Sequence, residues 1–196
     1  MNYFLTSERL GFRCWTADDE PLAIGLWCDP QVTALIGGPW SADVARERLA
    51  EEIDQQNKHG VQYWPVFLLS NGEHVGCAGL RPHRLEEKIY EMGIHLRPPF
   101  WSRGLASEAA HALIHFGFSK LGADALFVGH HPHNKGSRQL VQKLGFAYQR
   151  DQLYLPTGLM HPTYLLTRTT GMGASQESLE PAQADDSRQH QEKLKP

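Results

Sequence analysis

The segment from Phe100 to Phe118, FWSRGLASEAAHALIHFGF, is the part of this chain that most constrains its fold. Apolar and small residues recur in it at spacings of three and four, which predicts a helix with one buried face. Gly104 stands directly before that helix, where the first backbone N–H groups have no partner within the helix. The face that we expect to pack on a sheet comprises Ala106, Ala109, Ala110, Leu113, Gly117 and Leu121.

The start of this predicted helix has the features of an anion-binding site. A helix N-terminus combines partial positive charge with unpaired N–H groups, and both attract phosphate. Gly104 lets the backbone approach a ligand closely, Ala106 and Ser107 are small, and Arg103 adds a full positive charge. The alternative is a plain strand-to-helix turn that needs a glycine.

Short apolar runs and turn signals alternate along the rest of the chain. We expect strands at 9–15, 61–70, 74–82, 88–96, 125–131, 146–155 and 161–169, and helices at 16–29, 41–60, 105–121 and 134–145. Residues 30–40 are interpreted as a connection. The order β-α-α-β-β-β-α-β-α-β-β predicts an α/β (α+β) fold. Its mixed sheet is mostly antiparallel and flanked by helices, because hairpins join several of its strands.

Length and composition set limits on the class of protein. The chain has 196 residues and a net charge of −3, which favours one domain at 1–170 and weighs against nucleic-acid binding. Residues 171–196 have few large apolar side chains, so we expect a disordered tail. No apolar run approaches the ~20 residues of a membrane span, and no signal-peptide pattern begins the chain. Three isolated cysteines favour a cytoplasmic protein without a membrane partner.

A second motif lies downstream, where Asn134-x-x-Ser137 is followed by Lys143-Leu144-Gly145-Phe146. Together with the loop FWSRGLA at 100–106, these residues resemble the GNAT superfamily of acyl-CoA-dependent N-acetyltransferases, and within it the RimJ/RimL-like branch. The resemblance spans about residues 6–168, because TSERL at 6–10 and VGCAGL at 75–80 also match. It implies the GNAT fold, with the acyl-CoA in a splay between two central strands.

The resemblance also implies a cofactor, acetyl-CoA, and a reaction. The acetyl group would pass to a primary amine by direct attack in a ternary complex. The expected contacts with the cofactor come from the strand at 88–96, from the helix start and from the downstream motif: Ile94, His95, Leu96, Arg103, Gly104, Leu105, Ala106, Ser107, Asn134 and Ser137. The side chain of Leu105 is expected to matter little, because the contacts there are made by the backbone.

The sequence identifies the catalytic groups less completely than the cofactor contacts. Many members of the family place a Tyr seven residues after the Asn to protonate the departing thiolate, but Val141 stands there in this chain. Ser137 is the candidate that replaces it, as a hydrogen-bond donor to the sulfur. Strand alternation puts Glu91 and His95 on one face, so either is a candidate general base. A half-exposed strand with polar residues on its solvated side is the alternative.

The acceptor site is predicted only from position. The first two helices and the final hairpin wall it in the family, so we expect Trp40, Tyr154 and His161 to line it. The acceptor is left open between a protein N-terminus and a small molecule such as an amino acid, a polyamine or an antibiotic. A non-catalytic acyl-CoA-binding module is the alternative function, and a homodimer is left open.

Two further patterns are expected to carry no chemistry. His111 and His115, and the group His130, His131 and His133, have spacings that can bind zinc. They lack an HExxH motif and a cysteine partner, so we expect no metal site. The run RERLAEEIDQQNK at 46–58 is expected to form a solvated, charged helix face.

Overall fold

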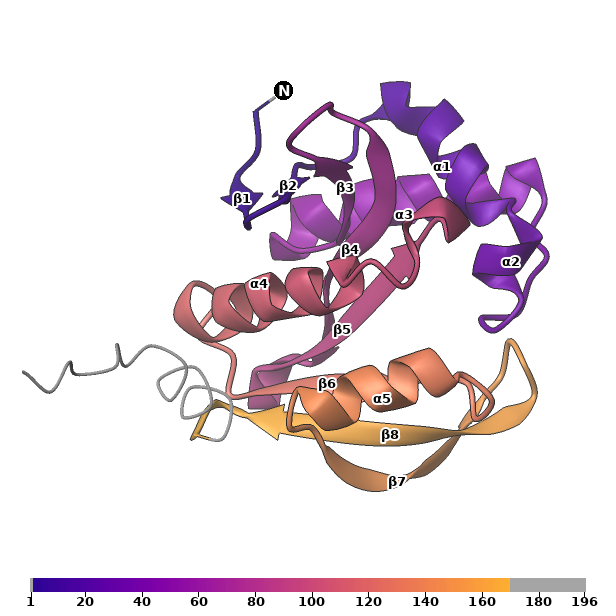
Figure 1. The fold of residues 1–196 in the computed structure, drawn as a ribbon. Coiled ribbons are helices and arrows are strands. Elements are labelled where there is room, and N and C mark those ends of the chain that lie inside the picture. The colour runs from indigo at the N-terminus through magenta and orange to yellow at the C-terminus, as the bar shows by residue number, and fades with distance from the viewer. Residues whose placement is uncertain (1, 170–196) are drawn as a thin grey trace, which may run out of the picture.

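The computed structural model describes residues 2–169, and the tail expected at 171–196 lies outside them. Eight strands form one sheet in the order β1-β2-β3-β4-β5-β6-β8-β7, with helices on both of its faces (Figure 1). The strands are β1 (Leu5–Thr6), β2 (Leu10–Phe12), β3 (Tyr63–Leu68), β4 (His74–Arg84), β5 (Ile89–Leu96), β6 (Ala125–Gly129), β7 (Ala147–Tyr154) and β8 (Leu159–Thr167). All neighbours pair antiparallel except β5 and β6, which pair parallel, so the mixed, mostly antiparallel sheet is confirmed.

The helices begin and end at signals that the sequence carries. They are α1 (Glu20–Trp27), α2 (Pro30–Thr33), α3 (Ala42–His59), α4 (Leu105–Ser119) and α5 (Lys135–Lys143), with short 3-10 turns at Ala17–Asp19, Leu85–Glu87 and Pro98–Phe100. The Ser41 hydroxyl accepts from the N–H of Val44 at 3.3 Å and so caps α3. Gly60 ends the same helix in the left-handed conformation, at φ 69°.

Two short elements, α2 and β1, were not predicted, and several predicted elements were too long. The connection at 30–40 contains α2, which Asp29 caps by accepting from the N–H of Gln31 at 2.8 Å. A single helical turn is too short to show an apolar period, so only the Asp-Pro pair marks it. The two-residue β1 is likewise too short for a pattern. The strand expected at 9–15 is restricted to Leu10–Phe12, because only these residues pair with β3.

The helices divide into two layers with separate cores. On one side, α4 and α5 contribute Leu113, Val141 and Leu144 to the larger buried cluster. On the other side, α1 and α3 contribute Trp27 and Leu49 to the smaller cluster. The sheet therefore carries a helical layer on each face, and the side chains of β5 reach both.

The predicted buried face of α4 is confirmed at its centre and shifted at its start. Ala109, Ala110, Leu113 and Gly117 are buried, whereas Ala106 and Leu121 are only partly buried at the margins. Leu105 is 1% exposed and packs in the core. That side chain therefore anchors the first turn of α4, while the expectation that it matters little for cofactor binding stays a prediction. Within residues 2–169, no helix combines the length and the apolar character needed to cross a membrane.

Candidate active site

The two parallel strands in the middle of the sheet separate part of the way along. Ile89, Tyr90 and Glu91 of β5 are in register with Ala125, Leu126 and Phe127 of β6. Beyond Glu91, β5 continues to Leu96 paired only with β4. Figure 1 shows β5 turning away from β6 over this stretch. One edge of β5 thus presents main-chain groups that no strand of the described residues pairs.

The direction of these main-chain groups follows from strand alternation. Arg97 N donates to Val75 O of the β4 side at 2.9 Å, so every second residue before it also faces β4. Ile94 and Leu96 therefore face the separated edge, and His95 faces β4. Trp101 Nε1 donates to Leu96 O at 2.7 Å, which occupies that carbonyl. Ile94 is left with its N–H and C=O directed toward the gap between the strands.

The N-terminus of α4 lies just beyond the end of β5 in the chain. Gly104 adopts φ 78°, a left-handed conformation that favours glycine, and no side chain caps the helix. A Cβ at position 104 would meet only Arg9 Nη2, at 3.5 Å, so the space around it is open. The N–H groups that precede the first helical bond, from Glu108 N to Gly104 O at 3.1 Å, are available to an anion.

Arg9, to which the sequence analysis gave no role, brings a second cation to this helix start. Arg9 Nη1 donates to Arg103 O at 3.1 Å, and Arg9 Nε donates to Glu108 Oε2 at 2.7 Å. Ser7 Oγ donates to the other oxygen of Glu108 at 2.6 Å. Burial opposes ionisation of Glu108, but these hydrogen bonds outweigh it and lower its pKa. The TSERL segment was visible in the sequence, and only the fold shows what it contacts.

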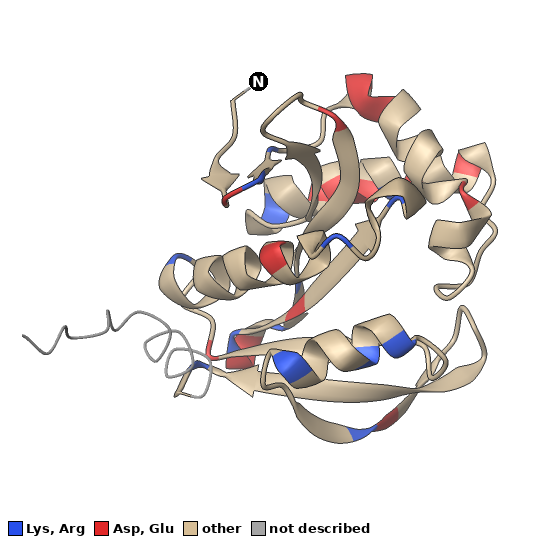
Figure 2. Ribbon diagram, viewed as in Figure 1, with Lys and Arg blue, Asp and Glu red and all other residues tan. Residues whose placement is uncertain are grey.

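Asn134 and Ser137 lie together at the start of α5. Asn134 Oδ1 accepts from Ser137 N at 3.0 Å, so Asn134 caps the helix. The Ser137 side chain is half-buried, and no hydrogen bond from another described residue reaches its hydroxyl. Val141 is 3% exposed within the core, which leaves that position without a proton donor. The charged residues of α5 are all basic (Figure 2), which suits an anionic cofactor.

Glu91, Gly93 and His95 lie on the face of β5 opposite α4, whereas Met92 and Leu96 pack in the α4 core, as alternation predicted. The ring of His95 stands edge-on to that of Tyr63 at 5.7 Å between centroids. Burial, with the nearby guanidinium groups of Arg48 and Arg81, lowers the pKa of His95 to about 3. An imidazole with so low a pKa is a weak proton acceptor. Burial raises the pKa of Glu91 despite the same two arginines.

The charged run of α3 is not uniformly solvated, contrary to expectation. Glu52 is fully buried, and its carboxylate accepts from Tyr63 N at 2.8 Å. Arg48 Nε donates to Glu52 Oε1 at 3.1 Å, and Arg81 Nη2 donates to the same oxygen. Sequence periodicity missed this group because Glu52 lies on the apolar side of α3, where its polar partners come from β3 and β4.

The three residues expected to line an acceptor site lie in different environments. Tyr154 is half-exposed at the end of β7, and its ring centroid is 4.7 Å from that of the buried His161. Burial raises the pKa of Tyr154, as does the charge of Glu91, whereas the charges of Arg48 and Arg81 oppose the rise. Tyr154 is therefore within electrostatic reach of the β5 face. Trp40 is partly buried against the α1 and α3 core.

The histidine patterns form no metal-binding group among residues 2–169, where no three His, Cys, Asp or Glu side chains are placed to hold an ion. His111 and His115 are exposed, as expected for a solvated helix face. The His131 ring lies 5.3 Å from that of His133 and 5.4 Å from that of His161, centroid to centroid.

The chain thus combines a parallel strand pair that separates part of the way along with a helix start that no side chain caps. Residues 9–147 match the family described as the acetyltransferase (GNAT) domain, so the chain belongs to the GNAT family of acetyltransferases. The predicted fold is thereby confirmed, and the GNAT fold is one that binds acetyl-CoA.

Three known proteins illustrate the similarity. An uncharacterized N-acetyltransferase of Bacillus licheniformis, p20, is 28% identical over 144 residues, covering 72% of this chain and 81% of that protein. The crystal structure of an acetyltransferase from Agrobacterium tumefaciens superposes with a TM-score of 0.72 at 23% identity, covering 86% of this chain and 98% of that one. The structure of RimL, a ribosomal L7/L12 alpha-N-protein acetyltransferase in complex with coenzyme A, superposes with a TM-score of 0.71 at 15% identity. The superposition covers 82% of this chain and 95% of that one. The likeness to both structures concerns the fold.

Proposed function

We propose that this protein transfers an acetyl group from acetyl-CoA to a primary amine by direct attack in a ternary complex. The observation that carries the proposal is the separation of β5 from β6 beyond Glu91, which leaves Ile94 with an unpaired main-chain edge. The pantetheine amides pair with Ile94, and the pyrophosphate binds the N–H groups from Arg103 to Ser107. Arg9, which is ion-paired with Glu108, holds this turn in place by donating to Arg103 O.

The roles of the catalytic side chains follow from their environments. Glu91 is the general base, because its raised pKa makes the carboxylate a better proton acceptor than an unperturbed one. His95 is a poor base, since a neutral imidazole with a pKa of about 3 holds a proton weakly. A pantetheine amide N–H donates to the Ile94 C=O, and we propose that the Ile94 N–H stabilises the oxyanion that forms as the amine attacks the thioester.

Ser137 assists the departing thiolate. Its hydroxyl has no hydrogen-bond partner among residues 2–169 and stands at the start of basic helix α5. We propose that it donates a hydrogen bond to the sulfur, while Asn134 anchors the pantetheine and caps α5. Tyr154, His161 and Trp40 wall the acceptor side. Three unpaired cysteines and a coenzyme A substrate fit a cytoplasmic setting.

Thiol release from acetyl-CoA in the presence of a panel of primary amines tests the proposal. Acetylated amine and free thiol should appear in equal amounts, with no thiol released in the absence of amine. Tight binding of coenzyme A without thiol release for any amine would favour a non-catalytic acyl-CoA-binding module. The buried Val141, at the position where many family members carry a Tyr, is the observation that favours this second function.

A further inference from the structure

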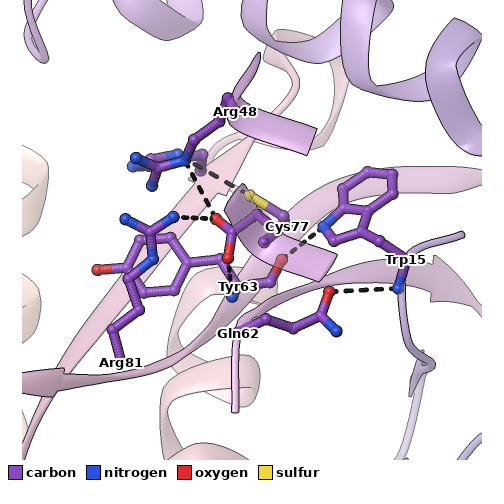
Figure 3. Close-up of polar contacts among 8 residues, drawn as sticks. Trp15, Arg48, Gln62, Tyr63, Cys77 and Arg81 are labelled. Carbon is purple, nitrogen blue, oxygen red and sulfur yellow. Dashed lines mark hydrogen bonds and ion pairs between the residues drawn. The ribbon is translucent and has the colours of Figure 1, made fainter. Parts of the chain in front are cut away.

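Two guanidinium groups converge beside the face of β5 that carries the proposed base. Glu52 Oε1 accepts one N–H from Arg48 and one from Arg81, while the other carboxylate oxygen accepts from Tyr63 N (Figure 3). Glu52 has no exposed side-chain surface, and the side chains of Arg48 and Arg81 are 17% and 19% exposed. The group therefore joins α3, β3 and β4 in one half-buried cluster.

The two guanidinium groups of this cluster have more N–H donors than Glu52 can accept from. Each guanidinium has five N–H donors, and Glu52 takes one from each. Arg81 Nε is buried without a hydrogen-bond partner, and no other described side chain accepts from either arginine. Glu91 lies within electrostatic reach but forms no ion pair with them within residues 2–169. Two guanidinium groups therefore share one carboxylate and keep most of their N–H donors free for a further acceptor.

Aromatic rings hold both guanidinium groups in place. Arg81 Cζ lies 4.5 Å from the centroid of the Tyr63 ring, and Arg48 Cζ lies 5.6 Å from the same centroid. Arg48 Cζ is also 5.8 Å from the centroid of Trp27. Such contacts fix the orientation of planar donors before a ligand arrives. The free N–H groups are thus presented in a defined geometry, as anion recognition requires.

The cluster lies on the side from which the acceptor amine must approach. Tyr63 lies against Gly93, between Glu91 and His95 along the same strand face. The turn of the β7–β8 hairpin lies against the connection between α2 and α3, since a Cβ at Gly37 would lie 2.7 Å from Pro156 Cβ. Tyr154, on the same hairpin, is within electrostatic reach of Arg48, Glu91 and Arg81.

We propose that Arg48 and Arg81 bind an anionic group of the acceptor, which is therefore a small amine that also carries a carboxylate or a phosphate. The inference rests on the proposed function, because it names the substrate class of the same site. The anion pairs with the free guanidinium N–H groups, and the amine is turned toward Glu91. A polycationic amine is disfavoured there, because its additional positive charges face two arginines across a half-buried surface.

Matched pairs of amines test this selectivity on the wild-type protein. Glycine is compared with glycinamide, and phosphoethanolamine with ethanolamine, with spermidine as the polycation. We expect kcat/KM for acetylation to be at least about 10-fold higher for the anionic member of one pair. The pair that shows the preference identifies carboxylate or phosphate as the anion. Equal values within both pairs, or a preference for spermidine, would overturn the inference while leaving the acetyl transfer intact.

Arg48→Gln provides the second arm, with Arg46→Gln as its matched control. Arg46 lies on the same helix but pairs with Glu20 and Asp43 at the exposed surface, at 2.7 Å each. Arg48→Gln should lower the anionic preference about 10-fold with coenzyme A affinity unchanged, whereas Arg46→Gln should retain it. Arg48→Lys keeps the charge, so its preference for the anionic amine should lie between those of Arg48→Gln and Arg46→Gln. An unchanged preference in a folded Arg48→Gln protein contradicts the assignment.

A binding measurement separates failure of this inference from failure of the proposed function. Calorimetry follows glycine, phosphoethanolamine and ethanolamine titrated into protein saturated with coenzyme A. Heat from an anionic amine that is lost in Arg48→Gln supports the anion site even if no amine is acetylated. If no anionic amine binds and none is acetylated in preference to its neutral partner, the anion site is excluded.

Discussion

The phenol ring of Tyr63 lies directly against the backbone of Gly93, so that a Cβ at position 93 would be 2.3 Å from Tyr63 Cζ. This contact joins β3 to β5 across the intervening strand and puts the Tyr63 hydroxyl between the positions of Glu91 and His95. The contact fixes the position of the Tyr63 ring, which packs against the guanidinium groups of Arg48 and Arg81 near Glu91. The residue at position 93 is therefore limited by the space beneath a buried aromatic ring.

Gly93→Ala should destabilise the protein and disturb this face. The added methyl group forces a buried ring to move, and overpacking of this kind costs about 1–3 kcal/mol. Chemical denaturation measures the loss in the free energy of unfolding. Gly25→Ala in α1 is the control, because nothing lies within 4 Å of its Cβ position. There the substitution should stabilise the helix by about 0.5–1 kcal/mol. Similar changes in both proteins would contradict the close contact.

Gly104→Glu should abolish binding of coenzyme A. The glutamate adds bulk and negative charge where we place the pyrophosphate, so we expect affinity to fall at least about 100-fold by calorimetry. Gly122→Glu is the control for backbone strain, because Gly122 has φ 65° and a free Cβ position at the other end of α4. If both variants lose affinity equally, backbone strain rather than the anion site explains the loss.

The pH profile should identify Glu91 as the base. Protonated Glu91 cannot accept the amine proton, so kcat/KM should fall as the pH drops through the pKa of Glu91, which burial raises above the usual value for Glu. Glu91→Gln should remove this acidic limb and lower kcat/KM about 100-fold or more. His95→Gln should keep the limb, because His95, with a pKa of about 3, stays neutral throughout the assay range. If the acidic limb is lost in His95→Gln and kept in Glu91→Gln, then His95 and not Glu91 is the base.

Ser137→Ala should lower turnover more than it lowers affinity for coenzyme A. Loss of one hydrogen bond to the sulfur is expected to reduce kcat about 10-fold, with the Kd for coenzyme A within about twofold. The cap of α5 survives, because Asn134 accepts from the Ser137 backbone N–H. Ser137→Thr, which keeps the hydroxyl, should recover part of the rate. Equal losses in kcat and affinity would restrict Ser137 to cofactor binding.

Much of the fold could be predicted because its signals are local. The periodicity of α4, the Ser41 cap and the Asn134 cap each depend on residues within a few positions of one another. Elements of two to four residues, such as β1 and α2, were not predicted, because so few residues cannot show a hydrophobic period. The alternation of β5 placed Glu91 and His95 on one face correctly.

The sequence by itself determined the order of the elements, the glycine at the start of α4 and the family to which the chain belongs, since each depends on short-range patterns. Only the tertiary structure decided which charges are buried together. Glu52, Arg48 and Arg81 come from two distant segments, and their burial depends on how α3 docks on β3 and β4. The pKa of His95 was decided in the same way, because desolvation comes from residues that packing, and not chain neighbourhood, puts around the ring.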